Sequence, residues 1–128
     1  MKYLLPVLLL AGLLYSCSGE TVTEKRVTNF STDVVRLQVS NPDNVFLDTL
    51  LIPGQTIVIG NSVEDESFPE PVDPSTDITY FVMVNSTDDT CTRNYQDPLM
   101  WVSLSERTKR TPSNFKHQYD FVVTNADF

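Results

Sequence analysis

Short runs of strand-forming residues, separated by turn-forming residues, recur along this chain from about residue 26 to its end. Residues 35–39 and 119–123 alternate apolar and polar side chains. A period of two is the pattern of a strand with one buried face and one solvated face. No segment of residues 26–128 keeps the 3.6-residue apolar period of an amphipathic helix over three turns. The pattern therefore predicts an all-β fold.

Further strand candidates lie between these two. Residues 45–52 are apolar on both faces over most of their length, and Pro53-Gly54 then fits a type II turn, in which glycine takes the positive φ. Residues 78–84 are also apolar on both faces, which is typical of a central strand buried between two layers. Residues 99–104 add another candidate and bring the number to about seven. Short consecutive strands of this kind predict an antiparallel β-sandwich or a barrel.

The N-terminal segment has the organisation of a bacterial signal peptide. Lys2 supplies a positive charge, and residues 4–14 form an apolar stretch, too short for a membrane-spanning helix of about 20 residues. Leu14-Tyr15-Ser16-Cys17 then resembles the lipobox at which bacteria cleave the signal and attach lipid to the new N-terminal cysteine. The resemblance implies Cys17 as the site of lipid attachment. An ordinary secretory signal cut near Ser16 or Ser18 and a retained apolar helix are the alternatives.

These features divide the chain into a cleaved signal peptide at residues 1–16, a lipidated tether at residues 17–25 and a β domain at residues 26–128. Removal of the signal leaves about 110 residues, enough for one domain with one core. In the enterobacterial sorting rule, an aspartate after the lipidated cysteine retains a lipoprotein at the inner membrane. Ser18 stands at that position. We therefore expect an outer-membrane location, on either the periplasmic or the surface face.

The overall charge of the chain is negative. It holds 17 Asp and Glu against 9 Lys and Arg, for a net charge of −8, and loss of Lys2 with the signal makes the mature form more negative. Nucleic acid and anionic lipid headgroups are poor partners for a surface of this overall charge. The same acidity is common in soluble exported domains, so it specifies no partner by itself.

The residue types that perform catalysis are scarce. Of the two cysteines, lipidation of Cys17 would leave Cys91 as the single thiol. His117 is the one histidine and stands beside Lys116 just before the last strand, where we expect it to be exposed. No histidine-based or serine-based catalytic motif is present in the sequence. We expect no catalytic residues and no enzyme activity, with a small hydrolase that uses loop carboxylates as the alternative.

Two polar segments separate the strand candidates. Residues 64–77 contain six acidic residues, three prolines and no basic residue, a composition that predicts a long exposed loop. Residues 85–97 are rich in Asn, Asp, Ser and Thr and include Asp88 and Asp89. Carboxylates of the two loops could bind calcium if the loops met, although charged loops usually only bind water. We expect no cofactor and no dedicated metal site, and Asp88 and Asp89 are the weak candidates.

Trp101 and Tyr95 are the candidate ligand-binding residues. Residues 99–104 place three apolar side chains on the even-numbered face, so Trp101 lies on the less apolar face of that strand. An exposed Trp101 with Tyr95 nearby could stack on a sugar ring, because an aromatic ring offers apolar area with a polar edge. A tryptophan packed in the core of the sandwich is the other interpretation, and we favour it over an exposed Trp101.

Three features together resemble the small lipoproteins common in Bacteroidetes genomes. They are the lipobox-like sequence, the turn Ile52-Pro53-Gly54-Gln55 between two strands, and the ending at residues 119–128. The resemblance implies an immunoglobulin-like or related β-sandwich and implies no activity. We expect a lipid-anchored envelope protein whose non-catalytic sandwich binds a protein or glycan partner and no nucleic acid. An accessory subunit of an outer-membrane assembly or uptake complex is the alternative among binding proteins.

Overall fold

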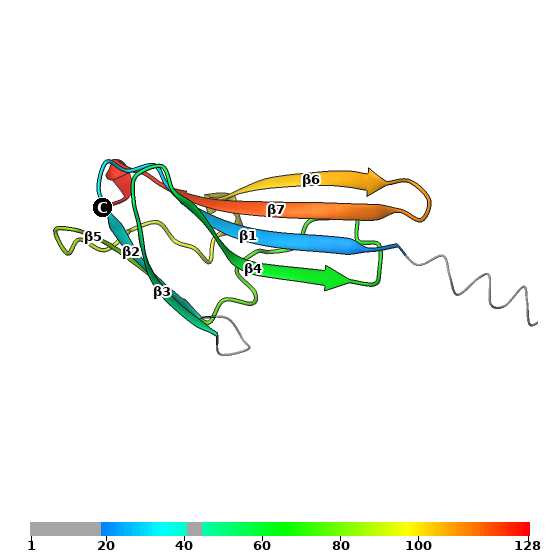
Figure 1. The fold of residues 1–128 in the computed structure, drawn as a ribbon, viewed down its shortest axis with the longest axis horizontal. Coiled ribbons are helices and arrows are strands. Elements are labelled where there is room, and N and C mark those ends of the chain that lie inside the picture. The colour runs from blue at the N-terminus through cyan, green and yellow to red at the C-terminus, as the bar shows by residue number, and fades with distance from the viewer. Residues whose placement is uncertain (1–18, 41–44) are drawn as a thin grey trace, which may run out of the picture.

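The computed structural model describes residues 19–40 and 45–128, so Cys17 and the signal segment lie outside the described residues. Within these ranges the chain forms seven strands and two 3₁₀ helices (Figure 1). The strands are β1 (Thr21–Asn29), β2 (Val35–Ser40), β3 (Phe46–Leu51), β4 (Thr56–Glu64), β5 (Tyr80–Asn85), β6 (Trp101–Lys109) and β7 (Asn114–Val123). The helices are η1 (Pro98–Met100) and η2 (Asn125–Asp127). None of the helices in these two ranges has the length and hydropathy to cross a membrane.

The strands form two sheets, which confirms the predicted all-β class and strand number. One sheet has the order β4-β1-β7-β6 and the other has the order β3-β2-β5. Neighbouring strands are antiparallel except β1 and β7, which run parallel from the pair Thr21–Phe115 to the pair Asn29–Val123. This parallel pair corrects the expectation of a wholly antiparallel sandwich. The strand order also differs from the immunoglobulin order, in which the first strand pairs with the second.

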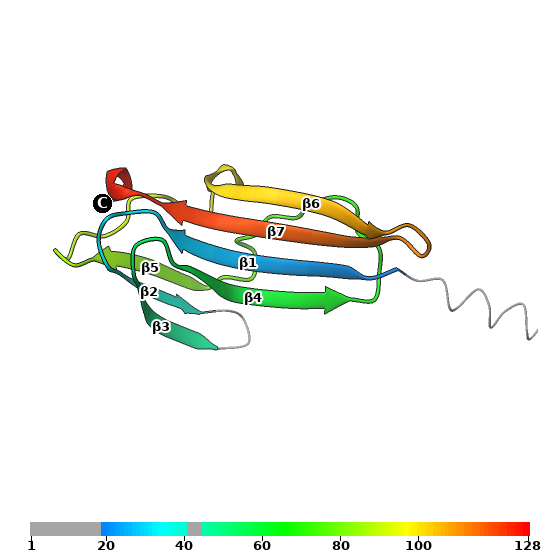
Figure 2. The same ribbon diagram turned by 45° about the horizontal axis from the view of Figure 1, so that its top comes forward.

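The three-stranded sheet packs against one half of the four-stranded sheet. Figures 1 and 2 show β2, β3 and β5 near the end of β1, while the half of the larger sheet at which β1 begins extends past them. The core lies in the shared half and takes side chains from both sheets, such as Leu37 of β2 and Phe121 of β7, both fully buried. Odd-numbered residues of β2 and β7 face this core, as the alternation at residues 35–39 and 119–123 predicts.

Residues 65–79, here called the strap, run from β4 to β5 across the inner face of the extended half. Thr21 Oγ1 donates to the carbonyl of Glu66 at 2.6 Å and accepts from the backbone N–H of Phe68 at 2.8 Å. Farther along, the backbone N–H of Val72 donates to Tyr119 Oη at 2.9 Å, and Pro74 is fully buried. Most strap side chains are exposed, as their composition predicts, but the backbone is bound to the sheet and is not a free loop.

The domain begins earlier than the sequence predicts. Residues 21–25 belong to β1 and pair with β4 and β7. Ahead of β1, the backbone N–H of Glu20 donates to Asn114 Oδ1 at 3.0 Å, and its carbonyl accepts from the backbone N–H of Phe115 at 2.9 Å. Gly19 lies so close to the backbone of Ser113 that a Cβ there would collide with it. The expected tether at residues 17–25 is therefore wrong from residue 19 onward.

Candidate binding surface on the three-stranded sheet

Trp101 lies in the core and not on the surface. Its side chain is 4% exposed, and its ring centroid lies 5.2 Å from that of Phe121. The indole N–H donates to the carbonyl of Tyr95 at 2.7 Å, and the Tyr95 ring stacks on Phe81 at 5.0 Å. A sugar ring has no free face of Trp101 on which to stack. The hypothesis of an exposed Trp101 is wrong, and the alternative of a core tryptophan is confirmed.

The register of β6 against β7 explains the orientation of Trp101. Trp101 pairs with Phe121, and paired residues of neighbouring strands point to the same face of a sheet. The inner face of β6 is therefore the one with Trp101. Val102 and Leu104 make the even-numbered side of β6 more apolar, and they are 60% and 57% exposed on the solvent side of the four-stranded sheet. The more apolar face of β6 is therefore the exposed one, which the apolar pattern of residues 99–104 does not predict.

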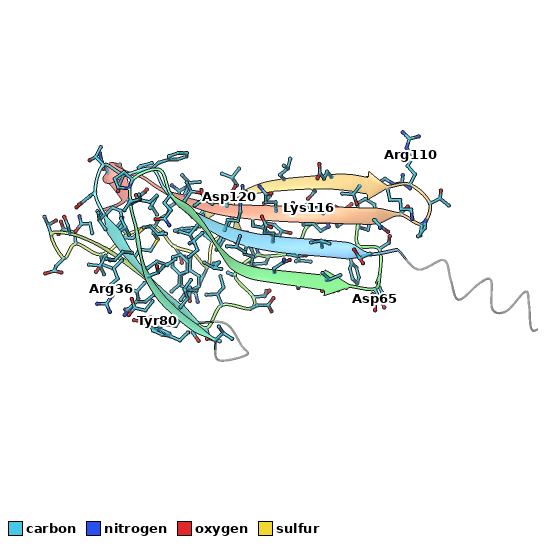
Figure 3. The ribbon with its side chains drawn as sticks, viewed as in Figure 1. Arg36, Asp65, Tyr80, Arg110, Lys116 and Asp120 are labelled. Carbon is cyan, nitrogen blue, oxygen red and sulfur yellow. The ribbon has the colours of Figure 1, made fainter. Side chains whose placement is uncertain are left out.

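Asp88 and Asp89 belong to the turn that follows β5. Asp88 has a φ of 66°, and the Asp89 carboxylate accepts from Thr87 Oγ1 at 2.8 Å. Glu64, at the start of the other acidic segment, pairs with Thr21 at the beginning of β1, near the position of Asp65 in Figure 3. The turn after β5 lies at the opposite end of β1.

The carboxylates at residues 64–66 therefore lie at the opposite end of β1 from Asp88 and Asp89, and the hypothesis of a calcium site shared between them is wrong. Ser86, next to this turn, donates to Asp33 Oδ2, just beyond the end of β1. Within residues 19–40 and 45–128, no group of three or more His, Cys, Asp and Glu side chains could hold a metal ion. Asp88 and Asp89 shape a turn in this arrangement.

His117 is buried, which corrects the expectation that it is exposed. It is 2% exposed on the inner face of β7, with Nδ1 2.7 Å from Ser105 Oγ and Nε2 2.6 Å from the carbonyl oxygen of Phe68. Because a carbonyl only accepts, Nε2 carries a hydrogen and donates it to the strap. His117 thus holds the strap on the sheet. The strap is distant in sequence, so the residues around His117 did not predict its burial.

Two exposed aromatic rings meet on the outer face of the three-stranded sheet. Phe46 of β3 is 54% exposed and Tyr80 of β5 is 44% exposed. Both pair with Ser40 on the central strand β2, and their ring centroids lie 6.2 Å apart. Figure 3 shows Tyr80 and Arg36 on this side of the molecule.

The register places two more rows of side chains on the same face. The middle row consists of Asp48, Gln38 and Val82, and the next row consists of Leu50, Arg36 and Val84. Leu50 is 61% exposed at one corner of the face. Phe46, Ser40 and Tyr80 form the first row, and we call the nine outward residues of the three rows the outer face. It is apolar at its margins and polar in its centre.

Arg36, Gln38 and Asp48 form one hydrogen-bonded group in the centre of the outer face. Arg36 Nε and Nη2 donate to the two Asp48 carboxylate oxygens at 2.8 and 2.6 Å, and Gln38 Nε2 donates to one of them at 3.0 Å. The hydrogen bonds from Arg36 and then Gln38 lower the pKa of Asp48 to about 2. The bond to Asp48 in turn raises the pKa of Arg36. The centre therefore presents paired charges.

The sequence contains a signal for this surface, because both of its edge strands are apolar on their two faces, a pattern that predicts burial. Residues 78–84 are apolar on both faces and predict a central strand, but β5 is an edge strand of its sheet. Its inner residues reach the core, and its outer residues form part of the outer face. Residues 45–52 behave alike in β3, the other edge strand. Apolar residues on both faces thus indicated an exposed apolar face.

The fold and this surface define an all-β protein of two packed sheets with an exposed aromatic face. Comparisons with protein families, with curated proteins and with solved structures find no match. Its function is therefore inferred from the residues of this chain.

Proposed function

We propose that this chain is a lipid-anchored protein of the bacterial cell envelope whose non-catalytic sandwich binds a partner protein through the outer face. The exposed pair of Phe46 and Tyr80 carries this proposal. Contiguous exposed apolar patches mark interaction sites, and the cores of protein interfaces are enriched in aromatic residues and arginine. The outer face combines two rings, the exposed Leu50 and the guanidinium of Arg36.

A protein partner fits the outer face better than a glycan. Arg36, Gln38 and Asp48 already bond to one another, so they leave few polar groups for sugar hydroxyls. The exposed side chains of Phe46, Tyr80 and Leu50 around this group offer apolar area instead. In addition, β3 is the last strand of its sheet, so one side of its backbone can accept a strand from a partner. An accessory subunit of an outer-membrane assembly or uptake complex would use the same features with a permanent partner.

The lipid on Cys17 would confine the domain to a membrane surface and raise its effective concentration near partners there. Weak individual contacts at the outer face would then suffice. The lipobox-like sequence supports this anchor, and Ser18 supports the outer membrane as its location. A hydrolase that uses loop carboxylates remains the alternative from another class of protein. Of its candidate carboxylates, Glu64 lies at the beginning of β1, whereas Asp88 and Asp89 lie near the opposite end.

A photo-crosslinking amino acid at position 46 or 80 tests the outer face. In intact cells, both positions should give the same crosslinked partner, because the two rings lie 6.2 Å apart. Position 102 is the matched control, because Val102 is 60% exposed on the outer side of the other sheet. Tyr80→Ser should remove the crosslink from position 46. Equal crosslinking from position 102, or none from positions 46 and 80, would overturn the proposal.

Cys17→Ala tests the anchor. The variant should move from the membrane fraction to the soluble fraction, and an unchanged distribution would overturn lipid attachment. A non-penetrating protease added to intact cells then determines the face of the membrane. Digestion would direct the search for a partner to host proteins and surface uptake complexes, whereas protection until lysis would direct it to envelope assembly.

A further inference from the structure

The basic residues of the chain form two groups that differ in their partners. The chain has nine, of which Lys2 belongs to the signal segment. Four of the remaining eight pair with carboxylates on the body of the domain. These pairs are Lys25–Asp77 at 3.3 Å, Arg26–Asp120 at 2.5 Å, Arg36–Asp48 at 2.6 Å and Arg93–Asp127 at 3.7 Å.

The other four basic residues lie together on the hairpin of β6 and β7. Residues 107–116, here called the basic hairpin, contain Arg107, Lys109, Arg110 and Lys116 and no acidic residue. In the described part of the chain, none of these four forms a salt bridge. Arg107 instead donates to the carbonyl of Arg110 at 3.0 Å and so holds the turn together. Glu106 lies opposite Lys116 in the register of β6 and β7, and Glu20 bonds to the hairpin backbone. Four positive charges therefore stand beside two negative ones, which leaves a local excess of positive charge on an acidic protein.

The basic hairpin lies beside the point at which the chain enters the domain. Gly19 is packed against Ser113 of the hairpin, and Glu20 exchanges hydrogen bonds with Asn114 and Phe115. Cys17 precedes Gly19 by two residues, which can span at most about 8 Å. Figure 1 shows the start of β1 and the hairpin at the same end of the molecule, and Figure 3 shows Arg110 at the tip.

We propose that the basic hairpin binds the phosphate groups of lipid headgroups in the membrane that holds the anchor. This inference rests on the proposed lipid attachment at Cys17. A lipid there would place the hairpin within a few ångströms of the headgroups, and the interaction of basic residues with an anionic surface acts within one Debye length of about 10 Å. The net charge of −8 predicts repulsion, but over such a distance the charge of the hairpin decides the interaction.

The acidic residues near the same end set the orientation of the domain. Glu64 is the last residue of β4, and Asp65 and Glu66 follow it; β4 is the edge strand opposite β6 in the sheet. Figure 3 shows Asp65 and Arg110 on opposite sides of this end. An anionic membrane would attract the β6 edge and repel the β4 edge, so the domain would tilt with its hairpin toward the lipid. The outer face lies toward the far end of the molecule and would remain accessible.

Fluorescence quenching by nitroxide-labelled headgroup lipid tests the contact. The lipidated protein carries Cys91→Ser and one new thiol, which is labelled with a fluorophore. The thiol is either Thr108→Cys within the basic hairpin or Thr90→Cys near the opposite end of β1. It is reconstituted in vesicles of phosphatidylcholine with or without phosphatidylglycerol. Quenching at position 108 should exceed quenching at position 90 several-fold with phosphatidylglycerol and should fall without it and at high salt.

Charge variants distinguish the effect of the basic hairpin on membrane contact from the effect of the protein's net charge. Lys109→Gln with Arg110→Gln should remove most of the quenching at position 108. Gln96→Glu with Leu99→Glu makes the same change in net charge near the other end of β6 and should leave it unchanged. Equal quenching at positions 108 and 90, or equal effects of the two double variants, would overturn the hairpin contact. Absence of lipid at Cys17 gives a result distinct from these, because the protein would not bind vesicles and Cys17 would react with the fluorophore as a second thiol.

Discussion

Asn29→Ala should remove a group of hydrogen bonds that joins the two sheets. Asn29 is fully buried at the end of β1. Its Nδ2 donates to the carbonyls of Asp33 at 2.8 Å and Leu51 at 2.9 Å. Its Oδ1 accepts from the backbone N–H of Ser31 at 2.9 Å and from Ser31 Oγ at 2.6 Å. The side chain thus connects the larger sheet to the end of β3 and to the β1–β2 connection.

The four hydrogen bonds of the Asn29 side chain set the expected loss of stability. A hydrogen bond contributes about 1 kcal/mol net, so their removal should lower the free energy of unfolding by about 4 kcal/mol. With a urea m-value of about 2 kcal/mol/M, the unfolding midpoint should fall by about 2 M. Fluorescence of Trp101, the one tryptophan, reports the transition because its side chain is 4% exposed in the fold.

Asn125→Ala is the matched control for Asn29→Ala. Asn125 Oδ1 accepts from the backbone N–H of Thr32 at 2.8 Å, but the residue is exposed and water can replace the lost bond. We expect its unfolding free energy to change by no more than about 0.5 kcal/mol. Equal destabilisation by the two substitutions would refute the argument that the buried amide joins the sheets.

The pairing on the outer face predicts that Asp48 titrates near a pH of about 2, because hydrogen bonds from Arg36 lower its pKa in the fold. Its contribution to stability is therefore present above the ordinary pKa of about 3.9 and is lost as the pH falls toward the folded value. Carboxyl carbon NMR should show this titration, and Arg36→Gln should raise the pKa; a wild-type value near the ordinary one would contradict the pairing. Burial raises the pKa of the Cys91 thiol, so a thiol reagent at neutral pH should react slowly with the native protein and faster in denaturant. With Cys17 lipidated, one thiol per chain should react, and a native rate equal to the denatured rate would argue against burial. His117→Phe should free the strap, lower the unfolding free energy by about 1 to 3 kcal/mol and increase proteolysis within the strap. Unchanged proteolysis would show that His117 does not hold it.

Local sequence patterns predicted much of the fold. The alternation at residues 35–39 and 119–123 identified inner and outer faces that the structure confirms. The turn at Pro53-Gly54 is also confirmed, because Gly54 has a φ of 82° and the Gln55 N–H donates to the carbonyl of Ile52 at 3.0 Å. These features depend on residues that are close in sequence, whose conformations follow from their own side chains.

The candidate surface was less predictable, because it depends on strand pairing between distant residues. Trp101 faces the core through its pairing with Phe121, and His117 is covered by a strap that begins far upstream. The exposure of Phe46 and Tyr80 follows from the edge positions of their strands. The sequence showed that both faces of these strands are apolar. It did not show whether another layer of the fold covers the second face.

The sequence by itself determined the all-β class, the positions of the two strands whose side chains alternate clearly, and the expectation of a lipid anchor at Cys17. It also determined the net charge, because a sum of charges does not depend on where they lie. The tertiary structure decided which apolar faces remain exposed and which charges remain unpaired. Four cations gather on one hairpin beside Gly19, while the other four meet carboxylates from distant segments. Both outcomes arise from contacts between residues far apart in the chain, and the local period of apolar side chains does not predict such contacts.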